Sequence, residues 1–536
     1  MRTRRRQGAI FIPVLVVGMV SAAACAGEQP KHLGALAARA GLSAATGAPA
    51  PPTAAGAGPA TAPAGVAGTD TSPAAGSAAA GAPGVTPAGG VSAPGATPSG
   101  SAAGPAAPAV SAAGGTAAGR SAAAESGGNR PSAATAAPGD RNTGRATPVP
   151  AQGNGGATDV GVTAETIKVG GFFIESGPVG ELGITLLKSV KALFNEVNAS
   201  GGIYGRKLQL VDCDTSFTSG DKPRACYTKL TQQDKIFAFT ATGDGPAWVT
   251  AAPLACKDGI PALWTDGLSE NEFECPTIFP TGPAGRSQAR VVLDWYIKNK
   301  HPKTVGILEQ NDDIGNEWLV GAKEVLNKYG VKIVSEQKYN LGETNFTTQV
   351  TNMRFANPDF VFFSSEPLGP ILFQKTAEGQ GWKPPLPSAG VTCNVNVWPK
   401  EVGDYSKGMI CQNPWQLLSA HLPGQAEFKQ TYKKYWSDWD KRNYYTEIMW
   451  VAARATVETL RRAGPNLTRA RVLDVLRSGA FNGFDTGFGV KFSQHSSAKG
   501  NLFSINVAVI EVTKPEDENP YVLLQAPIPD PYFKAG

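Results

Sequence analysis

The stretch FNEVNASGGIYGRKLQLVDCDT, residues 194–215, joins the end of a helix to the start of a strand through a glycine-rich turn. Residues 184–198 repeat apolar side chains at the spacing of one helical face, and residues 207–213 form a strand-like apolar run. The glycines within residues 201–205 permit the tight connection, because glycine adopts the left-handed backbone that such a turn needs. The stretch therefore predicts a helix that leads directly into a strand.

The same alternation extends along the chain on either side of this unit. Strand-like apolar runs occur at residues 166–173, 207–213, 236–240, 261–265, 304–309, 331–337, 360–364 and 408–412. Helix-like segments separate most of them, and strands joined by helical crossovers indicate parallel sheets with helices on both faces. About 380 residues follow the low-complexity front of the chain, a length that favours two such sheets over one.

The C-terminal part follows a different pattern. Residues 427–441, 446–463 and 468–478 have the composition and spacing of three consecutive helices. Residues 489–493 and 502–512 then flank a polar turn, which is typical of a β-hairpin. We therefore expect the alternating part of the fold to be followed by a helical layer and then a hairpin.

The chain begins with the features of a secretory signal peptide, which we place at residues 1–24. Four arginines within residues 2–6 form a positive n-region, and an apolar run over residues 8–24 precedes Cys25. The small residues before Cys25 resemble a bacterial lipobox, in which the cysteine is diacylated and becomes the mature N-terminus. We therefore predict lipidation at Cys25, with an ordinary cleaved signal and an incidental cysteine as the alternative.

Residues 25–157 are predicted to be a disordered linker. No Phe, Trp or Tyr occurs between Phe11 and Phe172, and residues 41–157 are almost wholly Ala, Gly, Pro, Ser and Thr. Such a composition cannot bury enough apolar surface to offset the entropy lost on ordering. Anchored at Cys25, the linker would be a tether that holds a folded module away from the membrane.

The charge of the mature chain argues against a nucleic-acid partner. The full sequence has a formal charge of +5, from 49 basic and 44 acidic residues. Removing the four arginines of the signal leaves 45 basic against 44 acidic residues, so the mature chain is nearly neutral. A nucleic-acid-binding protein needs a basic surface, which this balance does not provide.

Six cysteines follow Cys25, an even number that suggests three disulfides in an exported chain. They are Cys213, Cys226, Cys256, Cys275, Cys393 and Cys411. Six cysteines allow fifteen pairings, but pairing in sequence order closes three short loops, each around a turn beside a predicted strand. We therefore predict the pairs 213–226, 256–275 and 393–411. Metal binding is the alternative, although the chain has no Cys-x-x-Cys and no histidine near these residues. We predict no cofactor.

Six segments occur in an order and spacing that are specific in combination. They are GVTAETIKVGGFF (161–173), SGPVGELG (176–183), the stretch 194–215, FAFTATGDGPAWVTAAPLACKDGIPAL (237–263), TVGILEQNDDIGNEWLVGAKEVL (304–326) and NPDFVFFSSEP (357–367). Together they resemble the type I periplasmic-binding-protein family, in particular the leucine/isoleucine/valine-binding branch of ABC-transporter substrate-binding proteins. The resemblance covers residues 158–515 and none of the linker.

This resemblance implies an α/β fold of two doubly wound parallel-sheet lobes with a ligand cleft between them. The lobes would be joined by three chain crossings and would close on the ligand, which contacts both of them. We expect lobe 1 over residues 158–283 plus 414–488, and lobe 2 over residues 284–413 plus 489–530. The crossings would then lie near residues 281–283, 413–415 and 487–490.

Two glycine-rich turns favour a cleft at the edge of the first sheet. In SGPVGELG and ATGDGPAW a predicted strand gives way to a turn that opens a helix. Such turns place unpaired backbone N–H groups at the carboxyl edge of a parallel sheet, where open α/β sheets bind ligands. Simple turn formation explains either loop taken alone, but two such loops from one sheet favour a shared site.

The resemblance also implies a set of ligand-binding residues. In amino-acid-binding members, hydroxyls after two first-lobe strands hold the ligand carboxylate, and a second-lobe acidic residue holds its ammonium group. Ile314 stands where an aromatic residue is usual, and the second-lobe acidic position falls near residues 390–392. The candidate ligand-binding residues are Phe173, Thr242, Gly243, Asp244, Gly245, Pro246, Ala247, Thr265, Asp266, Gly267, Ile314, Glu366 and Thr392. The usual serine is missing from the first loop, and Asp244 and Asp266 would repel a carboxylate. These departures argue against a free branched-chain amino acid, whereas Glu366 suits a cationic or hydroxyl-bearing ligand.

Each of these side chains also has an ordinary structural role as an alternative. A carboxylate at the end of a strand is more often a helix cap or a solvated loop residue than a ligand contact. Phe173, Trp248 and Trp264 are candidates for an apolar wall of the cleft, but packing in the core is the more common role of such residues.

These features predict an extracytoplasmic, lipid-anchored solute-binding protein of an ABC importer. It would be a monomer on the outer face of the cytoplasmic membrane that binds a small polar solute, such as an amino acid, an amide or a related compound, and delivers it to a permease. A sensory module that signals to a membrane partner is the alternative. An exported enzyme is less favoured, because the four histidines are scattered and the chain has no Walker A loop, nucleophile elbow or His-Glu-x-x-His motif.

Overall fold

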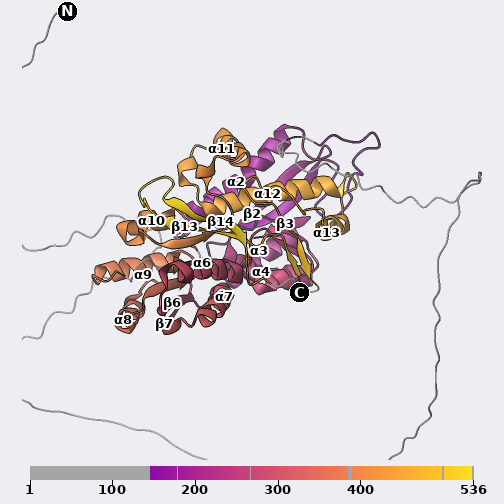
Figure 1. Ribbon diagram of the computed structural model, residues 1–536. Coiled ribbons are helices and arrows are strands. Elements are labelled where there is room, and N and C mark those ends of the chain that lie inside the picture. The colour runs from indigo at the N-terminus through magenta and orange to yellow at the C-terminus, as the bar shows by residue number, and fades with distance from the viewer. Residues whose placement is uncertain are drawn as a thin grey trace, which may run out of the picture. The chain divides into compact units, whose positions relative to one another are not determined.

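The computed structural model describes residues 145, 147–177, 179–265, 267–383, 389–390, 392–497 and 500–533 (Figure 1). The predicted signal peptide, the lipidation site Cys25 and most of the predicted linker lie outside the described residues, as does Asp266. The described residues contain two main β-sheets with helices packed against them, and we call the two sheets with their helices lobe 1 and lobe 2.

Lobe 1 is built on a parallel five-stranded sheet with the order β2-β1-β3-β4-β5. Its strands are β1 (Thr166–Phe173), β2 (Lys207–Asp214), β3 (Ala238–Thr240), β4 (Ala262–Thr265) and β5 (Ile278–Pro280). Its helices are α2 (Gly180–Ala199), α3 (Asp221–Thr228), the π-helical turn Lys229–Gln233, α4 (Gly245–Lys257), α5 (Glu270–Glu274), α11 (Pro423–Tyr435), α12 (Tyr444–Ala463) and α13 (Arg469–Arg477). Short 3₁₀ turns, Leu418–Ala420 and Trp439–Lys441, flank α11.

Apolar residues on both faces of the strands explain why this sheet is covered on both sides. Phe172 and Phe173 are adjacent on β1, so their side chains point to opposite faces. Phe172 packs with Phe239 and Trp248 in one core, whereas Phe173 packs in another core with residues of α2 such as Leu186. A strand that is buried on both faces has a nearly continuous apolar run, and this is the pattern of a doubly wound sheet.

Lobe 2 is built on a seven-stranded sheet with the order β14-β13-β10-β9-β8-β6-β7. Its parallel strands are β6 (Thr304–Gln310), β7 (Lys332–Tyr339), β8 (Phe360–Ser364), β9 (Ala389–Gly390) and β10 (Ile410–Asn413). Two antiparallel strands, β13 (Asn506–Val512) and β14 (Tyr521–Pro529), extend it at one edge. Its helices are α6 (Gly285–Lys300), α7 (Asp313–Tyr329), α8 (Thr347–Ala356), α9 (Leu368–Gly379) and α10 (Val397–Val402), which the 3₁₀ turn Gly403–Ser406 follows.

The sequence predictions of an α/β fold and of two doubly wound lobes are confirmed. The eight predicted strands are present as β1, β2, β3, β4, β6, β7, β8 and β10, with ends that differ by at most two residues. The predicted helix at residues 427–441 instead runs from Pro423 to Tyr435, because Pro423 suits the first turn of a helix.

The predicted hairpin of residues 489–493 and 502–512 is wrong. Residues 506–512 form β13, which pairs with β10 and β14 within the large sheet. A separate small hairpin consists of β11 (His495–Ser497) and β12 (Gly500–Leu502). No strand was predicted at the position of β14.

The predicted third crossing, near residues 487–490, is also displaced. Residues 489–502 were assigned to lobe 2, but Phe492 and Phe503 pack against Trp264 of β4, with ring centroids 5.2 and 4.7 Å apart. The strand β12 likewise contacts α5 and β5 of lobe 1. The chain therefore passes into lobe 2 only between Phe503 and the start of β13, because the aromatic cluster around Trp264 holds the preceding residues on lobe 1.

The last residues of the predicted linker belong to the folded part. The amide of Thr147 donates to the carbonyl of Gly202 at 3.0 Å, and the amide of Tyr204 donates to Thr147 at 2.9 Å. The fully buried guanidinium of Arg206 donates to the carbonyls of Asn154 and Gly156. Residues 147–157 are therefore fixed on lobe 1 by hydrogen bonds that composition alone does not reveal.

Candidate functional site

The two lobes meet at Gly245, the first residue of α4. A side-chain carbon added at Gly245 would lie 2.9 Å from Cδ1 of Leu268 and 3.4 Å from Cδ1 of Ile314. It would also lie 3.6 Å from Oε1 of Glu366. Ile314 is on α7 and Glu366 follows β8, so both belong to lobe 2. The structure thus brings together three of the predicted site residues, Gly245, Ile314 and Glu366, and the tightest contact of an added carbon at Gly245 would be with Leu268 of lobe 1.

A polar contact between the lobes lies beside this point. The hydroxyl of Tyr445, in the first turn of α12, donates to Oε2 of Glu366 at 3.4 Å. The backbone amide of Glu366 donates to the side-chain oxygen of Gln310 at 3.2 Å, which fixes the loop after β8. Glu366 is only 5% exposed. A buried carboxylate of lobe 2 therefore faces a hydroxyl of lobe 1.

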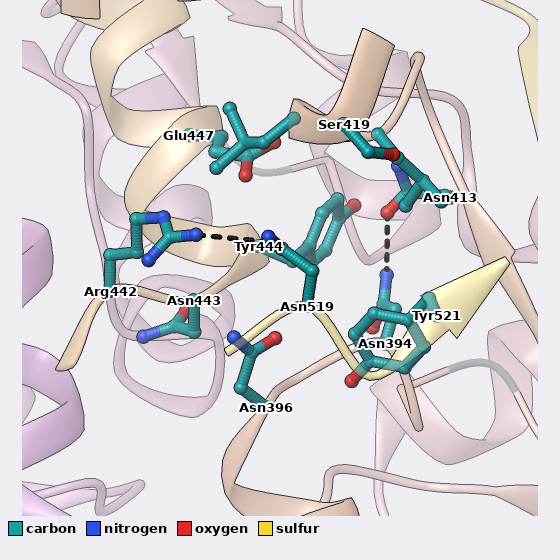
Figure 2. A pocket seen from close by; sticks show the side chains of 12 residues that line it. Asn394, Asn396, Asn413, Ser419, Arg442, Asn443, Tyr444, Glu447, Asn519 and Tyr521 are labelled. Atoms are coloured by element: carbon teal, nitrogen blue, oxygen red, sulfur yellow. Dashed lines mark hydrogen bonds between the residues drawn. The ribbon is translucent and has the colours of Figure 1, made fainter. Parts of the chain in front are cut away.

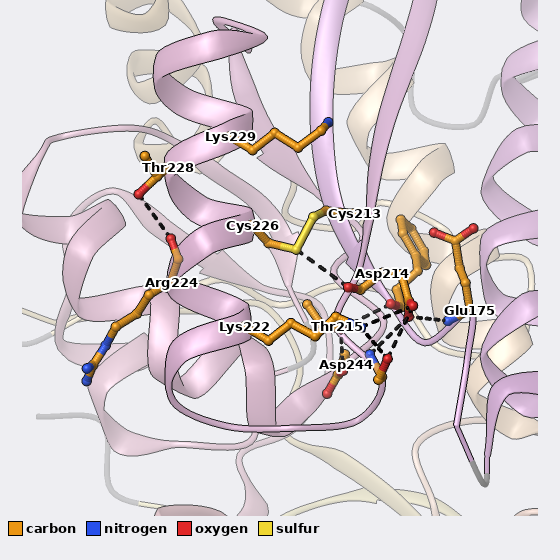
Figure 3. The surroundings of a disulfide bond; sticks show 12 residues. Glu175, Cys213, Asp214, Thr215, Lys222, Arg224, Cys226, Thr228, Lys229 and Asp244 are labelled. Carbon is orange, nitrogen blue, oxygen red and sulfur yellow. Dashed lines mark hydrogen bonds and ion pairs between the residues drawn. A yellow bond between two sulfur atoms is a disulfide. The ribbon is translucent and has the colours of Figure 1, made fainter. Parts of the chain in front are cut away.

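Asp244 caps α4 and is buried. Its side chain accepts from the amides of Ala247 at 3.2 Å and Phe217 at 3.1 Å, and from the hydroxyl of Thr215 (Figure 3). Burial raises the pKa of Asp244 to about 6, although these donors favour the ionised form. Three protein donors thus occupy this carboxylate, which acts as a helix cap and fixes the loop that leads to Gly245.

Glu272 organises the second loop of lobe 1, and the sequence analysis missed it. Its carboxylate accepts from the indole of Trp248 at 2.8 Å and the hydroxyl of Thr265 at 2.7 Å. It also accepts from the amides of Gly267, Leu268 and Ser269 at 3.3, 3.0 and 3.3 Å. Burial raises the pKa of Glu272. The pattern Ser-x-x-Glu at 269–272 is the sequence signature of a helix N-terminus and was the available signal.

The remaining predicted residues lie in or beside this region in different roles. Thr242 is fully buried, and its hydroxyl has no hydrogen-bond partner within the described part of the chain. The hydroxyl of Thr392 donates to the carbonyl of Ser365 at 2.6 Å. Phe173 is in the core and packs against the position of Gly243. Pro246 and Ala247 form the buried first turn of α4.

A pocket is lined by residues of both lobes (Figure 2). Together with its open mouth, the pocket has an empty volume of about 430 Å³. Its lining residues are Asn394, Asn396, Asn413, Leu417, Leu418, Ser419, Arg442, Asn443, Tyr444, Glu447, Asn519 and Tyr521. They come from the loop after β9, the crossing after β10, the start of α12 and the loop before β14.

An ion pair between Arg442 and Glu518 joins the two lobes beside this pocket. Arg442, on lobe 1, donates to Oε1 of Glu518 on lobe 2 at 2.8 Å, and to the side-chain oxygen of Asn519 at 3.1 Å. Glu447 is 7% exposed and accepts from the indole of Trp415 at 3.3 Å. Burial raises the pKa of Glu447 to about 8, against the attraction of Arg442. None of these residues was predicted, because they come from four segments that are far apart in the sequence.

The three predicted disulfides are confirmed. They are Cys213–Cys226, Cys256–Cys275 and Cys393–Cys411, with Cα–Cα distances of 5.8, 5.9 and 5.5 Å. The first joins β2 to α3, beside the loop that holds Asp244 (Figure 3). The third joins the loop after β9 to β10 and so fixes the residues that precede Asn394. All six cysteines are therefore paired in disulfides, so none of them has a free thiol to bind a metal ion.

The described residues contain no cluster of His, Cys, Asp and Glu side chains that could hold a metal ion. Within the same residues, no helix combines the length and the apolar composition that crossing a membrane requires.

Two α/β lobes joined by three crossings, with polar groups where they meet, define a two-lobed binding protein. Residues 166–513 match the sequence description of the family named periplasmic binding protein. The chain belongs to this family, which confirms the resemblance seen in the sequence.

The relatives have low sequence identity to this chain, but the matches cover most of each relative's length. A Leu/Ile/Val-binding protein homolog 7 from Brucella abortus (strain 2308) is 22% identical over 351 residues, covering 62% of this chain and 86% of the relative. A fatty acid ABC transporter substrate-binding protein from Thermomonospora curvata has a similar structure, with a TM-score of 0.62 and 18% identity over 71% of this chain and 97% of that one. The structure of a branched-chain amino acid ABC transporter from Thermus thermophilus with bound valine is also similar, with a TM-score of 0.59 and 17% identity. The match covers 68% of this chain and 98% of that chain. These likenesses establish the fold.

Proposed function

We propose that this protein is an extracytoplasmic solute-binding lipoprotein of an ABC importer. It captures a small polar solute by closure of its two lobes and delivers the solute to a membrane permease. The contact between the lobes at Gly245, Ile314 and Glu366 is the observation that carries this proposal. A solute that contacts both lobes stabilises the closed arrangement relative to the open one, and this difference in affinity drives closure.

The polar groups at the meeting of the lobes support a polar solute. Glu366 of lobe 2 and the unpartnered hydroxyl of Thr242 of lobe 1 are buried hydrogen-bonding groups. Buried polar groups of this kind fix the orientation of a ligand and provide its specificity. We therefore place the predicted site residues Thr242, Gly245, Ile314 and Glu366 in the closing cleft.

The location follows from the family and is supported by the cysteines. The name of the family implies a place outside the cytoplasm. Three disulfides suit an oxidising compartment, because cytosolic thiols are normally kept reduced. In this proposal Cys25 carries the lipid anchor, residues 25–146 form the tether, and the protein acts as a monomer that binds its solute without turnover.

A thermal-shift screen of the purified full chain tests the proposal. Amino acids, amides, short peptides, polyols and aromatic acids would each be added, and we expect at least one class to raise the melting temperature through binding to the folded state. The solute should be recovered unchanged after incubation. If no small molecule stabilises the protein, or if the bound solute is consumed, the proposal is wrong.

A further inference from the structure

Polar side chains from both lobes line the pocket of Figure 2. Lobe 1 contributes Arg442, Tyr444 and Glu447 to its walls, whereas lobe 2 contributes Asn394 and Tyr521. Asn413 lies at the end of β10, where the chain crosses from one lobe to the other. A ligand in this pocket would therefore touch both lobes next to a crossing of the chain between them, so its binding would favour the closed arrangement.

Asn394 is the residue that points most directly to a ligand. Its side chain is 1% exposed, and its amide nitrogen donates to the side-chain oxygen of Asn413 at 3.4 Å. That hydrogen bond orients the amide and leaves Oδ1 as the remaining acceptor. Within the described residues this oxygen has no hydrogen-bond partner, although it is buried. Buried acceptors in proteins are normally paired, so this oxygen is suited to a donor on a ligand.

The charges of the pocket are balanced without a ligand. The guanidinium of Arg442 pairs with Glu518 at 2.8 Å, so it does not present an unpaired positive charge. Burial raises the pKa of Glu447 to about 8, so at neutral pH this side chain is mostly an uncharged carboxyl group that both donates and accepts. The Nε–H of Arg442 is buried and has no hydrogen-bond partner within the described residues, so it suits a neutral acceptor such as a hydroxyl oxygen of the ligand.

The neutral polar groups of the lining can pair with the hydroxyls of a ligand. Five of the twelve lining residues are asparagines, whose amides offer one acceptor and two donors each. A hydroxyl both donates and accepts, so it pairs with such amides and with a neutral carboxyl group. Tyr521 also lines the pocket, and its hydroxyl donates to the carbonyl of Cys393 at 3.0 Å, which holds the ring in place. Aromatic rings next to amides suit a solute with an apolar face and several hydroxyls.

This inference rests on the proposed function and narrows its solute. We propose that the pocket between Asn394 and Glu447 binds a neutral polyhydroxylated solute, of the class of polyols and monosaccharides. A hydroxyl of the solute donates to Oδ1 of Asn394, and others pair with Glu447 and the neighbouring asparagines. Arg442 and Glu518 hold the two lobes together at the rim of the pocket.

Calorimetric titration of the full chain with neutral polyols and monosaccharides, in parallel with amino acids, tests this assignment. We expect a polyol or a monosaccharide to bind, and Asn394→Leu, which keeps the size but removes the polar groups, to weaken binding about tenfold or more. Asn396→Ala, at a half-buried position on the same wall, is a second variant that disturbs the fold less.

Asn299→Leu is the matched control, since it makes the same change at an exposed position of α6, outside this pocket and outside the predicted cleft. We expect it to keep the affinity for the polyol or monosaccharide. Binding of amino acids alone would overturn the assignment and leave the proposed function intact. The same holds if Thr242→Val, a change in the predicted cleft, abolishes binding while Asn394→Leu and Asn396→Ala do not. If no solute of any class binds, the proposed function and this inference both fail.

Discussion

Glu447 makes the stability of the protein depend on pH in a defined direction. Burial raises its pKa from 4.5 to about 8, so the folded state holds a proton that the unfolded state releases between these two pH values. This contribution to stability is complete below pH 4.5 and is lost as the pH rises through about 8. At 1.36 kcal/mol per pH unit the full loss is about 5 kcal/mol, which we take as an upper limit because buried sites relax and admit water.

The variant Glu447→Gln removes the titrating group and keeps its shape. We expect the free energy of unfolding of the variant to exceed that of the wild type by about 2–4 kcal/mol at pH 8.5, and the difference to shrink or reverse at pH 5. Urea unfolding with intact disulfides at pH 5, 7 and 8.5 measures this difference directly. Taking the difference between variant and wild type cancels other titrations, such as that of Asp244.

An exposed glutamate provides the control for this experiment. Glu378 is exposed on α9, so Glu378→Gln should change the free energy of unfolding by less than about 0.5 kcal/mol at every pH. If the difference between Glu447→Gln and the wild type is the same at pH 5 and pH 8.5, Glu447 is not held in its protonated form and the reasoning about the pocket is refuted.

Three further changes test separate parts of the structure. Gly245→Val places two methyl groups where one added carbon would already lie 2.9 Å from Leu268, so we expect at least about tenfold weaker solute binding by calorimetry, whereas Gly379→Val, which has open space, should bind normally. Arg206→Ala leaves four partly buried carbonyls without their donor and should lower the free energy of unfolding in urea by about 2–4 kcal/mol; a loss below about 1 kcal/mol would show that they find other donors. Removing the 393–411 disulfide by a double Cys→Ala change should lower the free energy of unfolding in urea by about 3 kcal/mol. An unchanged free energy of unfolding would contradict the pairing.

The alternating part of the fold was predictable because its signals are local. Strands such as β1 and β8 are continuous apolar runs between helical segments, and the period of the side chains identifies each of them. The strands β5 and β9 have only three and two residues, which is too short for any periodic pattern. The antiparallel edge was missed for another reason, since the placement of β13 beside β10 depends on pairing across about 100 residues of sequence.

The third crossing shows how packing between distant residues overrides a local pattern. Gly487 and Gly489 have the composition of a hinge, yet the chain stays on lobe 1 until Phe503. The reason is the aromatic cluster in which Phe481, Phe492 and Phe503 surround Trp264. Sequence identifies these residues as apolar but does not reveal that they share one neighbour.

The candidate site was only partly predictable. The loops after β3 and β4 and the positions of Ile314 and Glu366 followed from the family resemblance, and the structure places these residues near one another. Asp244 fills the structural role of a helix cap, which the sequence analysis kept as the alternative. The pocket around Asn394 and Glu447 depends on four separate segments, and no local pattern links them.

A crystal structure of the full chain with its most stabilising solute tests the central claim most directly. The account predicts that the solute lies between the lobes and makes hydrogen bonds to residues of both. A solute bound on the surface of one lobe, with the lobes arranged as they are in its absence, would contradict it.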